Sequence, residues 1–188
     1  MYNEVYFWLV VIVLSFLAYP YLRFLFKRLQ LLRGLKRICR KDGLELTFRK
    51  GWLFDGFSEH RTAFTVESSD KIWSVKLVGA LKRSNYINLT DRKSYSVRKV
   101  YATLRGIHGG VTYDEFISRP KRPFDFTSQI DTSTNKQIVP ILLVCPVPTQ
   151  ICGVVGNRLR VIGVGMDTGE GLLYTGSSFI GLLEKSVS

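Results

Sequence analysis

Residues 5–22 of this chain read VYFWLVVIVLSFLAYPYL, 18 residues without a charged side chain. At ~1.5 Å per helical residue they extend for about 27 Å, close to the thickness of the hydrocarbon core of a bilayer. Tyrosine and tryptophan side chains lie near both ends of the run, as is usual at the two interfaces of a membrane. We therefore expect residues 1–22 to form a single transmembrane anchor.

Two other kinds of segment share this apolar character. A cleaved signal peptide carries positive charge before the apolar run and a small-residue cleavage site after it. Here Glu4 precedes the run and no Ala-x-Ala motif follows it. A helix in the core of a soluble domain seldom holds so many uncharged residues in succession. The anchor is therefore the interpretation that we prefer.

Positive charge is concentrated directly after this run. Eight of the 27 Lys and Arg residues lie between Arg23 and Lys41, a segment that contains no Asp or Glu. Because an excess of Lys and Arg marks the cytoplasmic side of a membrane helix, we expect the N-terminus outside the cell membrane and residues 43–188 in the cytoplasm. Asp42-Gly43 is a helix stop, which predicts a basic juxtamembrane helix over residues 23–42.

The apolar residues of this predicted helix fall near one stripe at helical spacing, and they are Phe24, Leu31, Leu35 and Ile38. Either the stripe packs on the following domain, or the helix lies against anionic lipid headgroups, where each close cation contributes ~1 kcal/mol. The cations that would face the membrane surface in the second case are Lys27, Arg28, Arg33, Lys36, Arg37, Arg40 and Lys41.

Residues 43–188 are rich in strand patterns and predict one mixed α+β domain built on antiparallel hairpins. The clearest unit is a hairpin in which residues 61–67 and 72–78 flank a four-residue turn. Pairing Glu67 with Ile72 puts one set of apolar side chains on a common face, namely Phe64, Val66, Trp73, Val75 and Leu77. A second hairpin is expected from residues 85–90 and 94–101.

The second half of the domain is less regular. Thr112 and Glu115 have the spacing of a capping box, which predicts a short helix through Ser118. Residues 141–145, ILLVC, are a continuous apolar run that predicts a strand buried on both faces. Further strands are expected at residues 158–164 and 171–175, and a final helix at residues 179–185, capped by Ser177 or Ser178.

The cysteines and histidines form no catalytic or metal-binding pattern. Cys39, Cys145 and Cys152 lack the spacing of a disulfide framework or a zinc site, and His60 and His108 stand apart. We interpret the cysteines as free thiols in a reducing compartment. The glycines between residues 163 and 171 lack the spacing of a phosphate-binding loop. We therefore expect no catalytic residues, no metal and no small-molecule cofactor.

The order of elements, with a basic helix before a hairpin and a late buried strand, resembles the topology of the restriction-endonuclease-like fold over about residues 30–185. In that family a metal-binding Asp lies on one hairpin strand and an acidic-x-Lys motif on the next. Here Ser74-Val75-Lys76 occupies the acidic-x-Lys place, and Ala63 lies opposite Lys76, near Thr62 and Thr65. Because Mg²⁺ needs hard oxygen ligands, the resemblance implies a domain without nuclease chemistry, and we interpret Lys76 as a solvated strand lysine.

Basic side chains interleaved with Tyr86, Tyr95 and Tyr101 form the best candidate for nucleic-acid binding, since phosphates need cations and bases stack on exposed rings. The alternative, which we prefer, is a solvated sheet face with its tyrosines partly in the core. The candidate residues are Lys76, Lys82, Arg83, Arg92, Lys93, Arg98, Lys99 and Arg105.

The sequence therefore predicts a membrane-tethered, non-catalytic interaction module. Its expected contacts are the lipid bilayer and a protein partner, to which the cytoplasmic domain is presented. Two alternatives stay open. One is a membrane-linked nucleic-acid-binding protein with a degenerate nuclease-like fold, and the other is an enzyme, such as a nuclease, whose site the sequence does not reveal.

Overall fold

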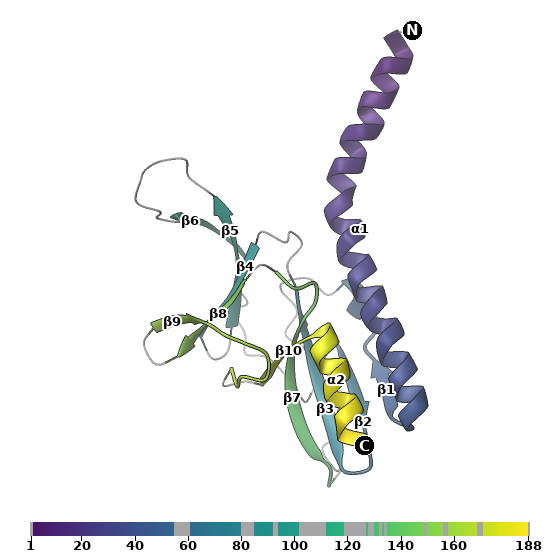
Figure 1. Ribbon diagram of the computed structural model, residues 1–188, viewed down its shortest axis with the longest axis vertical. Helices are drawn as coiled ribbons and strands as arrows, with labels where there is room; N and C mark the ends of the chain where they lie inside the picture. Colours follow the sequence, from purple (N-terminus) through teal and green to yellow (C-terminus); the bar gives the residue numbers. More distant parts are fainter. Residues whose placement is uncertain are drawn as a thin grey trace.

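The computed structural model describes residues 2–54, 61–79, 85–91, 94–101, 112–118, 127, 130–131, 133, 135–148, 150–155, 158–168 and 171–187. Within them a helix of 41 residues, α1 (Tyr2–Asp42), precedes two five-stranded sheets, and a second helix, α2 (Gly176–Val187), follows them. The first half of α1 projects away from the rest of the protein, whereas its second half lies beside the first sheet (Figure 1).

The first sheet is mixed, and its strand order is β1-β2-β3-β7-β10. The first three strands are antiparallel, whereas β7 lies between β3 and β10 and is parallel to both. Glu67 pairs with Ile72, which confirms the register predicted for the first hairpin. The strands of this sheet are β1 (Glu45–Phe48), β2 (Phe64–Glu67), β3 (Lys71–Val78), β7 (Gln137–Val144) and β10 (Leu172–Thr175), and a 3-10 turn lies at Trp52–Phe54, after β1.

The second sheet has the strand order β6-β5-β4-β8-β9. Its β4 and β5 form the predicted second hairpin, and β8, which has no counterpart among the expected elements, is parallel to β4. The sheet comprises β4 (Asn85–Asp91), β5 (Ser94–Tyr101), β6 (Thr112–Ser118), β8 (Gln150–Val155) and β9 (Arg158–Val161).

The helix predicted for residues 112–118 is wrong, because this segment is strand β6 and pairs antiparallel with β5. The capping-box spacing of Thr112 and Glu115 is only a local preference. It stabilises the first turn of a helix too weakly to form a short helix by itself. Aromatic and β-branched residues such as Tyr113 and Ile117 favour a strand, and the edge of β5 supplies the hydrogen-bonding partner.

Both helices cover the same face of the first sheet. The stripe on α1 is buried against that face, as are Phe179 and Leu183 from α2. At Gly34 the helices touch so closely that an added Cβ would lie 2.5 Å from the Cδ1 atom of Ile180. The apolar stripe of the basic helix thus packs on the following domain, and it consists of Phe24, Leu31, Leu35 and Ile38.

The opposite face of the first sheet packs against the second sheet. Val78, Leu142 and Leu173 form a buried cluster there with Ile87 and Ile151 of the second sheet. Leu143, the neighbour of Leu142, is buried on the helix-covered face. Strand β7 is therefore buried on both faces, as its continuous apolar sequence predicts.

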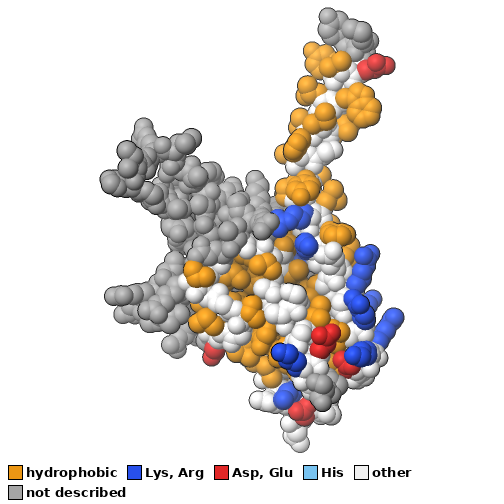
Figure 2. All heavy atoms as spheres, viewed as in Figure 1, with side chains coloured by type: hydrophobic (Ala, Val, Ile, Leu, Met, Phe, Trp, Pro, Cys, Tyr) orange, Lys and Arg blue, Asp and Glu red, His pale blue; other side chains and the backbone are white. Residues whose placement is uncertain are grey.

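The first half of α1 has no place in the protein core. None of its most apolar 18-residue window is buried, and Phe16 is 77% exposed. Figure 2 shows the hydrophobic side chains gathered on this projecting half and Lys and Arg side chains beside the second half. By length and composition α1 is able to cross a membrane, and its exposure argues against a buried core helix at residues 5–22.

The two helix ends next to the domain are capped by local hydrogen bonds. Gly43, with φ 66°, ends α1, and the N–H of Leu44 donates to the carbonyl of Cys39 at 2.9 Å, as the predicted stop signal requires. Helix α2 starts at Gly176, three residues before the predicted start. Thr175 precedes the helix, and its Oγ1 accepts from the N–H of Ser178. The expected Ser178 takes part in this cap, since its Oγ accepts in return from the N–H of Thr175 at 2.8 Å.

Candidate functional site

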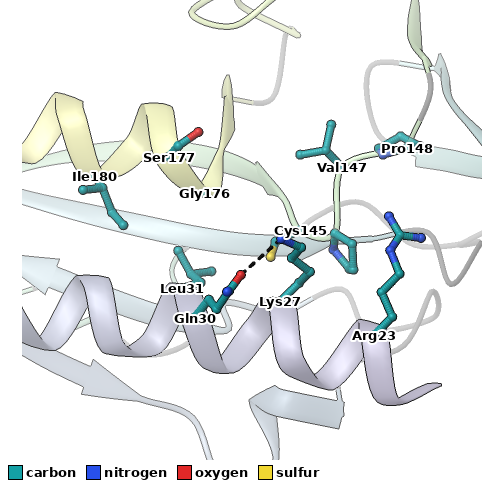
Figure 3. A pocket seen from close by; sticks show the side chains of 11 residues that line it. Arg23, Lys27, Gln30, Leu31, Cys145, Val147, Pro148, Gly176, Ser177 and Ile180 are labelled. Atoms are coloured by element: carbon teal, nitrogen blue, oxygen red, sulfur yellow. Dashed lines mark hydrogen bonds between the residues drawn. The ribbon is translucent and has the colours of Figure 1, made fainter. Parts of the chain in front are cut away.

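A pocket of about 540 Å³ lies where the second half of α1, the segment after β7 and the start of α2 meet. Figure 3 shows Arg23 and Lys27 extending from α1 toward residues 145–148, with the start of α2 nearby. Three segments far apart in the chain therefore build one site. Its lining consists of Arg23, Lys27, Gln30 and Leu31 of α1, Cys145, Pro146, Val147 and Pro148, and Gly176, Ser177 and Ile180 of α2.

The pocket is positively charged. Its lining contains two cations, Arg23 and Lys27, and no carboxylate. Among the residues that the structure describes, neither cation pairs with an Asp or Glu, and Lys27 Nζ donates only to Gln30 Oε1, at 3.2 Å. Because the N-terminus of a helix carries a partial positive charge, the start of α2 adds to this potential. The arrangement favours an anionic ligand.

Beside the pocket, Arg28 connects α1 to the body of the protein. Its side chain is only 1% exposed, and its guanidinium lies 4.1 Å from the centre of the Phe24 ring. The Nε atom donates to the carbonyl of Cys145 at 3.3 Å, and Nη1 donates to the carbonyls of Trp52 and Leu53 at 3.3 and 3.0 Å. Arg28 therefore holds the pocket wall and the turn after β1 against the helix.

The prediction that Arg28 faces the membrane surface is wrong. Position 28 follows Phe24 by four residues and precedes Leu31 by three, so it lies on the buried stripe rather than beside it. The other six candidates are exposed on α1, and their contact with lipid stays a prediction. These residues are Lys27, Arg33, Lys36, Arg37, Arg40 and Lys41.

A buried row of polar side chains occupies the other face of the first sheet. Lys76 on β3 is 0% exposed, so its interpretation as a solvated lysine is wrong, and so is its placement on an accessible nucleic-acid surface. Two residues before it, Ser74 Oγ lies 3.0 Å from Thr62 Oγ1 in a buried hydrogen bond. The alternation along β3 turns these polar residues away from the helices, to the face of the first sheet on which Val78 and Leu142 also lie.

The remaining nucleic-acid candidates are only partly placed. Arg98 and Lys99 lie on β5, where Arg98 pairs with Tyr86 of β4 and with Phe116 of β6. Five other candidates fall outside the described residues, namely Lys82, Arg83, Arg92, Lys93 and Arg105.

The thiol of Cys145 forms part of the pocket wall. Burial raises the pKa of this thiol to about 11, and the charges of Arg28 and Lys27 offset part of that increase. Cys145 is a free cysteine, as is the buried Cys39. Within the described part of the chain no group of three or more His, Cys, Asp or Glu side chains has a metal-binding arrangement. A thiol that stays protonated at neutral pH is a poor nucleophile and a poor metal ligand.

Comparison of the chain with protein-family models, with curated proteins and with solved structures finds no match. The residues of the site must therefore be interpreted from their own geometry and chemistry.

Sequence reasoning placed Lys27 near the membrane but did not find the pocket. The cations of the pocket lie on α1, whereas the opposite wall of the pocket comes from residues more than a hundred positions later in the chain. The one local sign is Arg23, which directly follows the apolar run and is followed by Lys27 one helical turn later. That spacing puts both cations on one side of α1, but it does not show what they face.

Proposed function

We propose that this protein is a membrane-tethered, non-catalytic interaction module whose domain is held at the cytoplasmic surface of the cell membrane and presented to a protein partner. The observation that carries the proposal is the continuity of α1. One unbroken helix has an exposed apolar half, and its other half contributes Leu31, Leu35 and Ile38 to the domain core. A signal peptide that is cleaved after the apolar run has no need of such continuity.

The continuity of α1 has a mechanical consequence. A flexible linker would let a tethered domain sample many orientations, whereas α1 enters the domain without a break and Arg28 fastens it there. The domain therefore keeps a set orientation relative to the anchor. Such an arrangement suits a module that presents one surface to a partner in or beside the membrane.

The proposal of a protein partner is supported by exposed apolar side chains on the domain. Outside α1, the described large apolar residues with high exposure are Val147, Val161, Val164 and Met166, and the last three lie in or directly after β9. Apolar groups gathered on a surface are typical of protein contacts. A photo-crosslinker placed at Val164 in cells should give discrete protein adducts, whereas one at the exposed Glu184 of α2 should give few. Equal labelling at both positions would contradict a partner at this surface.

The tether is tested by membrane flotation. Full-length protein mixed with liposomes and washed at alkaline pH should float with the lipid, and it should need detergent for extraction. Protease added outside intact cells should leave the domain uncut, because the Lys and Arg excess of α1 favours the cytoplasmic side. Recovery of the protein in the supernatant without detergent would refute the proposal.

The non-catalytic part of the proposal is tested on the purified full-length protein. We expect no Mg²⁺-dependent cleavage of DNA or RNA, because Ser74 and Ala63 stand where the nuclease-like family that this topology resembles carries carboxylates. Nuclease activity that disappears in Lys76→Ala, but remains in a variant of the exposed Lys50, would instead favour an enzyme.

A nucleic-acid-binding protein is the second candidate. It is favoured by the order of α1, the β2–β3 hairpin and the late strand β7 beside β3, because this order resembles the topology of the restriction-endonuclease-like fold. This candidate predicts that binding of the full-length protein to DNA or RNA falls steeply with salt. Charge reversal at Arg98 and Lys99 should weaken that binding, whereas reversal at Arg40 and Lys41 should leave it nearly unchanged. An absence of binding at low salt would exclude this candidate.

A further inference from the structure

The pocket between α1 and α2 lies at a defined depth relative to the apolar run. Arg23 is the first residue after residues 5–22, and Lys27 follows it by four residues, or ~6 Å along the helix. The headgroup layer of a bilayer is about 5–8 Å thick on each side of the hydrocarbon core. If α1 spans the membrane, as the proposed function requires, both cations stand at the level of lipid phosphates.

The lining of the pocket suits an amphipathic anion. Arg23 and Lys27 provide guanidinium and ammonium donors, and Lys27 uses one of its three N–H groups for Gln30. The opposite wall is apolar at Pro146 and Val147, and Val147 is 45% exposed. A volume of about 540 Å³ lies within the usual range for small-molecule sites. A phosphate group with attached carbon chains matches both halves of this lining.

We propose that this pocket binds the phosphate headgroup of an anionic membrane phospholipid. Arg23 and Lys27 contact the phosphate oxygens, and the segment 146–148 contacts the glycerol and the first part of the acyl chains. The inference rests on the proposed membrane tether, and it adds a specific ligand site to it. The bound lipid would join α1, the loop after β7 and α2, since residues of all three line the pocket.

The test uses full-length protein in detergent micelles that contain phosphatidylglycerol or phosphatidylcholine. Native mass spectrometry counts retained lipid, and thermal unfolding reports its effect on stability. We expect preferential retention of phosphatidylglycerol and a higher unfolding temperature with it. The variant Arg23→Gln/Lys27→Gln should retain this lipid roughly thirtyfold more weakly, since each cation near a lipid surface contributes about a fivefold change in affinity.

A matched control separates a pocket from general charge attraction. The variant Arg33→Gln/Lys36→Gln removes two exposed cations from the same helix, outside the pocket, and should retain phosphatidylglycerol like the parent protein. Equal loss in both variants would overturn the proposal in favour of a diffuse basic surface. If inorganic phosphate alone gives the same stabilisation, the pocket is a free-phosphate site and the lipid assignment is wrong.

Failure of the lipid site is distinguishable from failure of the tether. Arg23→Gln/Lys27→Gln leaves the apolar run intact, so it should still float with liposomes while it loses the retained lipid. If the parent protein floats but retains phosphatidylglycerol and phosphatidylcholine equally, the lipid site is refuted and the tether stands. If the parent protein does not float, the tether is refuted as well.

Discussion

Arg28 shows how one side chain joins a projecting helix to a folded domain. Its guanidinium satisfies three backbone carbonyls, of Cys145, Trp52 and Leu53, which belong to two separate segments. Burying a charged group is costly unless hydrogen bonds and neighbouring charges compensate. The compensation here depends on the planar guanidinium, which lysine cannot reproduce.

Replacement of Arg28 by methionine should destabilise the protein strongly. The methionine side chain fills much of the space, but the three carbonyls lose their donor, and we expect a loss of roughly 2–4 kcal/mol in the free energy of unfolding. Arg28→Lys should be intermediate. Chemical denaturation of the full-length protein in detergent measures the change. The exposed Arg33→Met is the control and should stay within about 0.5 kcal/mol of the parent; similar losses in both variants would contradict a buried anchor.

Cys145 predicts a dependence of stability on alkaline pH. Because burial raises the pKa of its thiol to about 11, the unfolded chain releases this proton near pH 9 while the folded protein keeps it. The thiol is protonated in both states at pH 8 and makes no pH-dependent difference there, and stability falls as the pH rises from about 9 to 11. Compared with Cys145→Ala, the parent protein should lose roughly 1 kcal/mol between pH 8 and pH 10.

Urea denaturation measures the free energy of unfolding of the parent protein and of Cys145→Ala at each pH. The difference between the two values isolates the contribution of Cys145, because the other titrating groups are common to both proteins. Alkylation of the native protein gives an independent check, since a protonated buried thiol reacts slowly at neutral pH. A pH-independent difference in stability, together with rapid alkylation at pH 7, would show that the thiol is not buried as described.

At the scale of elements, each of the two helices contains a glycine, and only the one in α1 serves the contact between α1 and α2. Gly34 on α1 leaves room for the Cδ1 atom of Ile180, whereas nothing lies within 4 Å of a Cβ added at Gly181. Ridges of one helix pack into the grooves of another only when the contact residues match in size. Gly34 thus serves the contact, and Gly181 only costs helix stability.

Substitution at these glycines should have opposite effects. Gly181→Ala should stabilise the protein by about 0.5–1 kcal/mol, because alanine is the better helix former and meets open space. Gly34→Leu should destabilise it by about 1–3 kcal/mol, because Ile180 has to move within a packed interface. Thermal unfolding of both variants measures the difference, and a neutral Gly34→Leu would mean that the helices are not in close contact.

Several elements follow from local pattern alone. The hairpin of β2 and β3, the buried strand β7 and the end of α1 at Asp42 agree with the predictions, because alternation and helix-stop residues act between neighbours in the chain. Strand β6 does not, because its conformation is decided by pairing with β5. A capping motif has no influence on whether a sheet edge is available.

At the scale of the whole molecule, the folded unit begins inside α1. The buried residues Leu31 and Leu35 belong to the same hydrophobic cluster as Phe64 and Val75 of the sheet. The predicted boundary between residues 42 and 43 therefore runs through the core. In contrast, the most apolar window of α1 contributes nothing to that core.

Two truncations test where the folded unit begins. A chain that starts at residue 23 should be soluble without detergent and should unfold with nearly the same free energy as the full-length protein. A chain that starts at residue 43 should be unfolded or aggregated, because it lacks four buried apolar side chains that each contribute about 1.5–3 kcal/mol. Circular dichroism and gel filtration distinguish the outcomes. A stable fold of the chain that starts at residue 43 would refute the conclusion that the folded unit begins inside α1.

The sequence alone predicts the apolar run, the cationic segment after it and the main hairpin, because each depends on residues close together in sequence. It does not predict the burial of Arg28 and Lys76 or the pocket at Arg23. The hydrogen bond from Arg28 to Cys145 joins residues 117 positions apart, and Lys76 is buried although the pattern of its own strand predicts a solvated position. Hydrophobic periodicity describes which face of an element is buried, whereas the identity of what covers that face follows from chain topology.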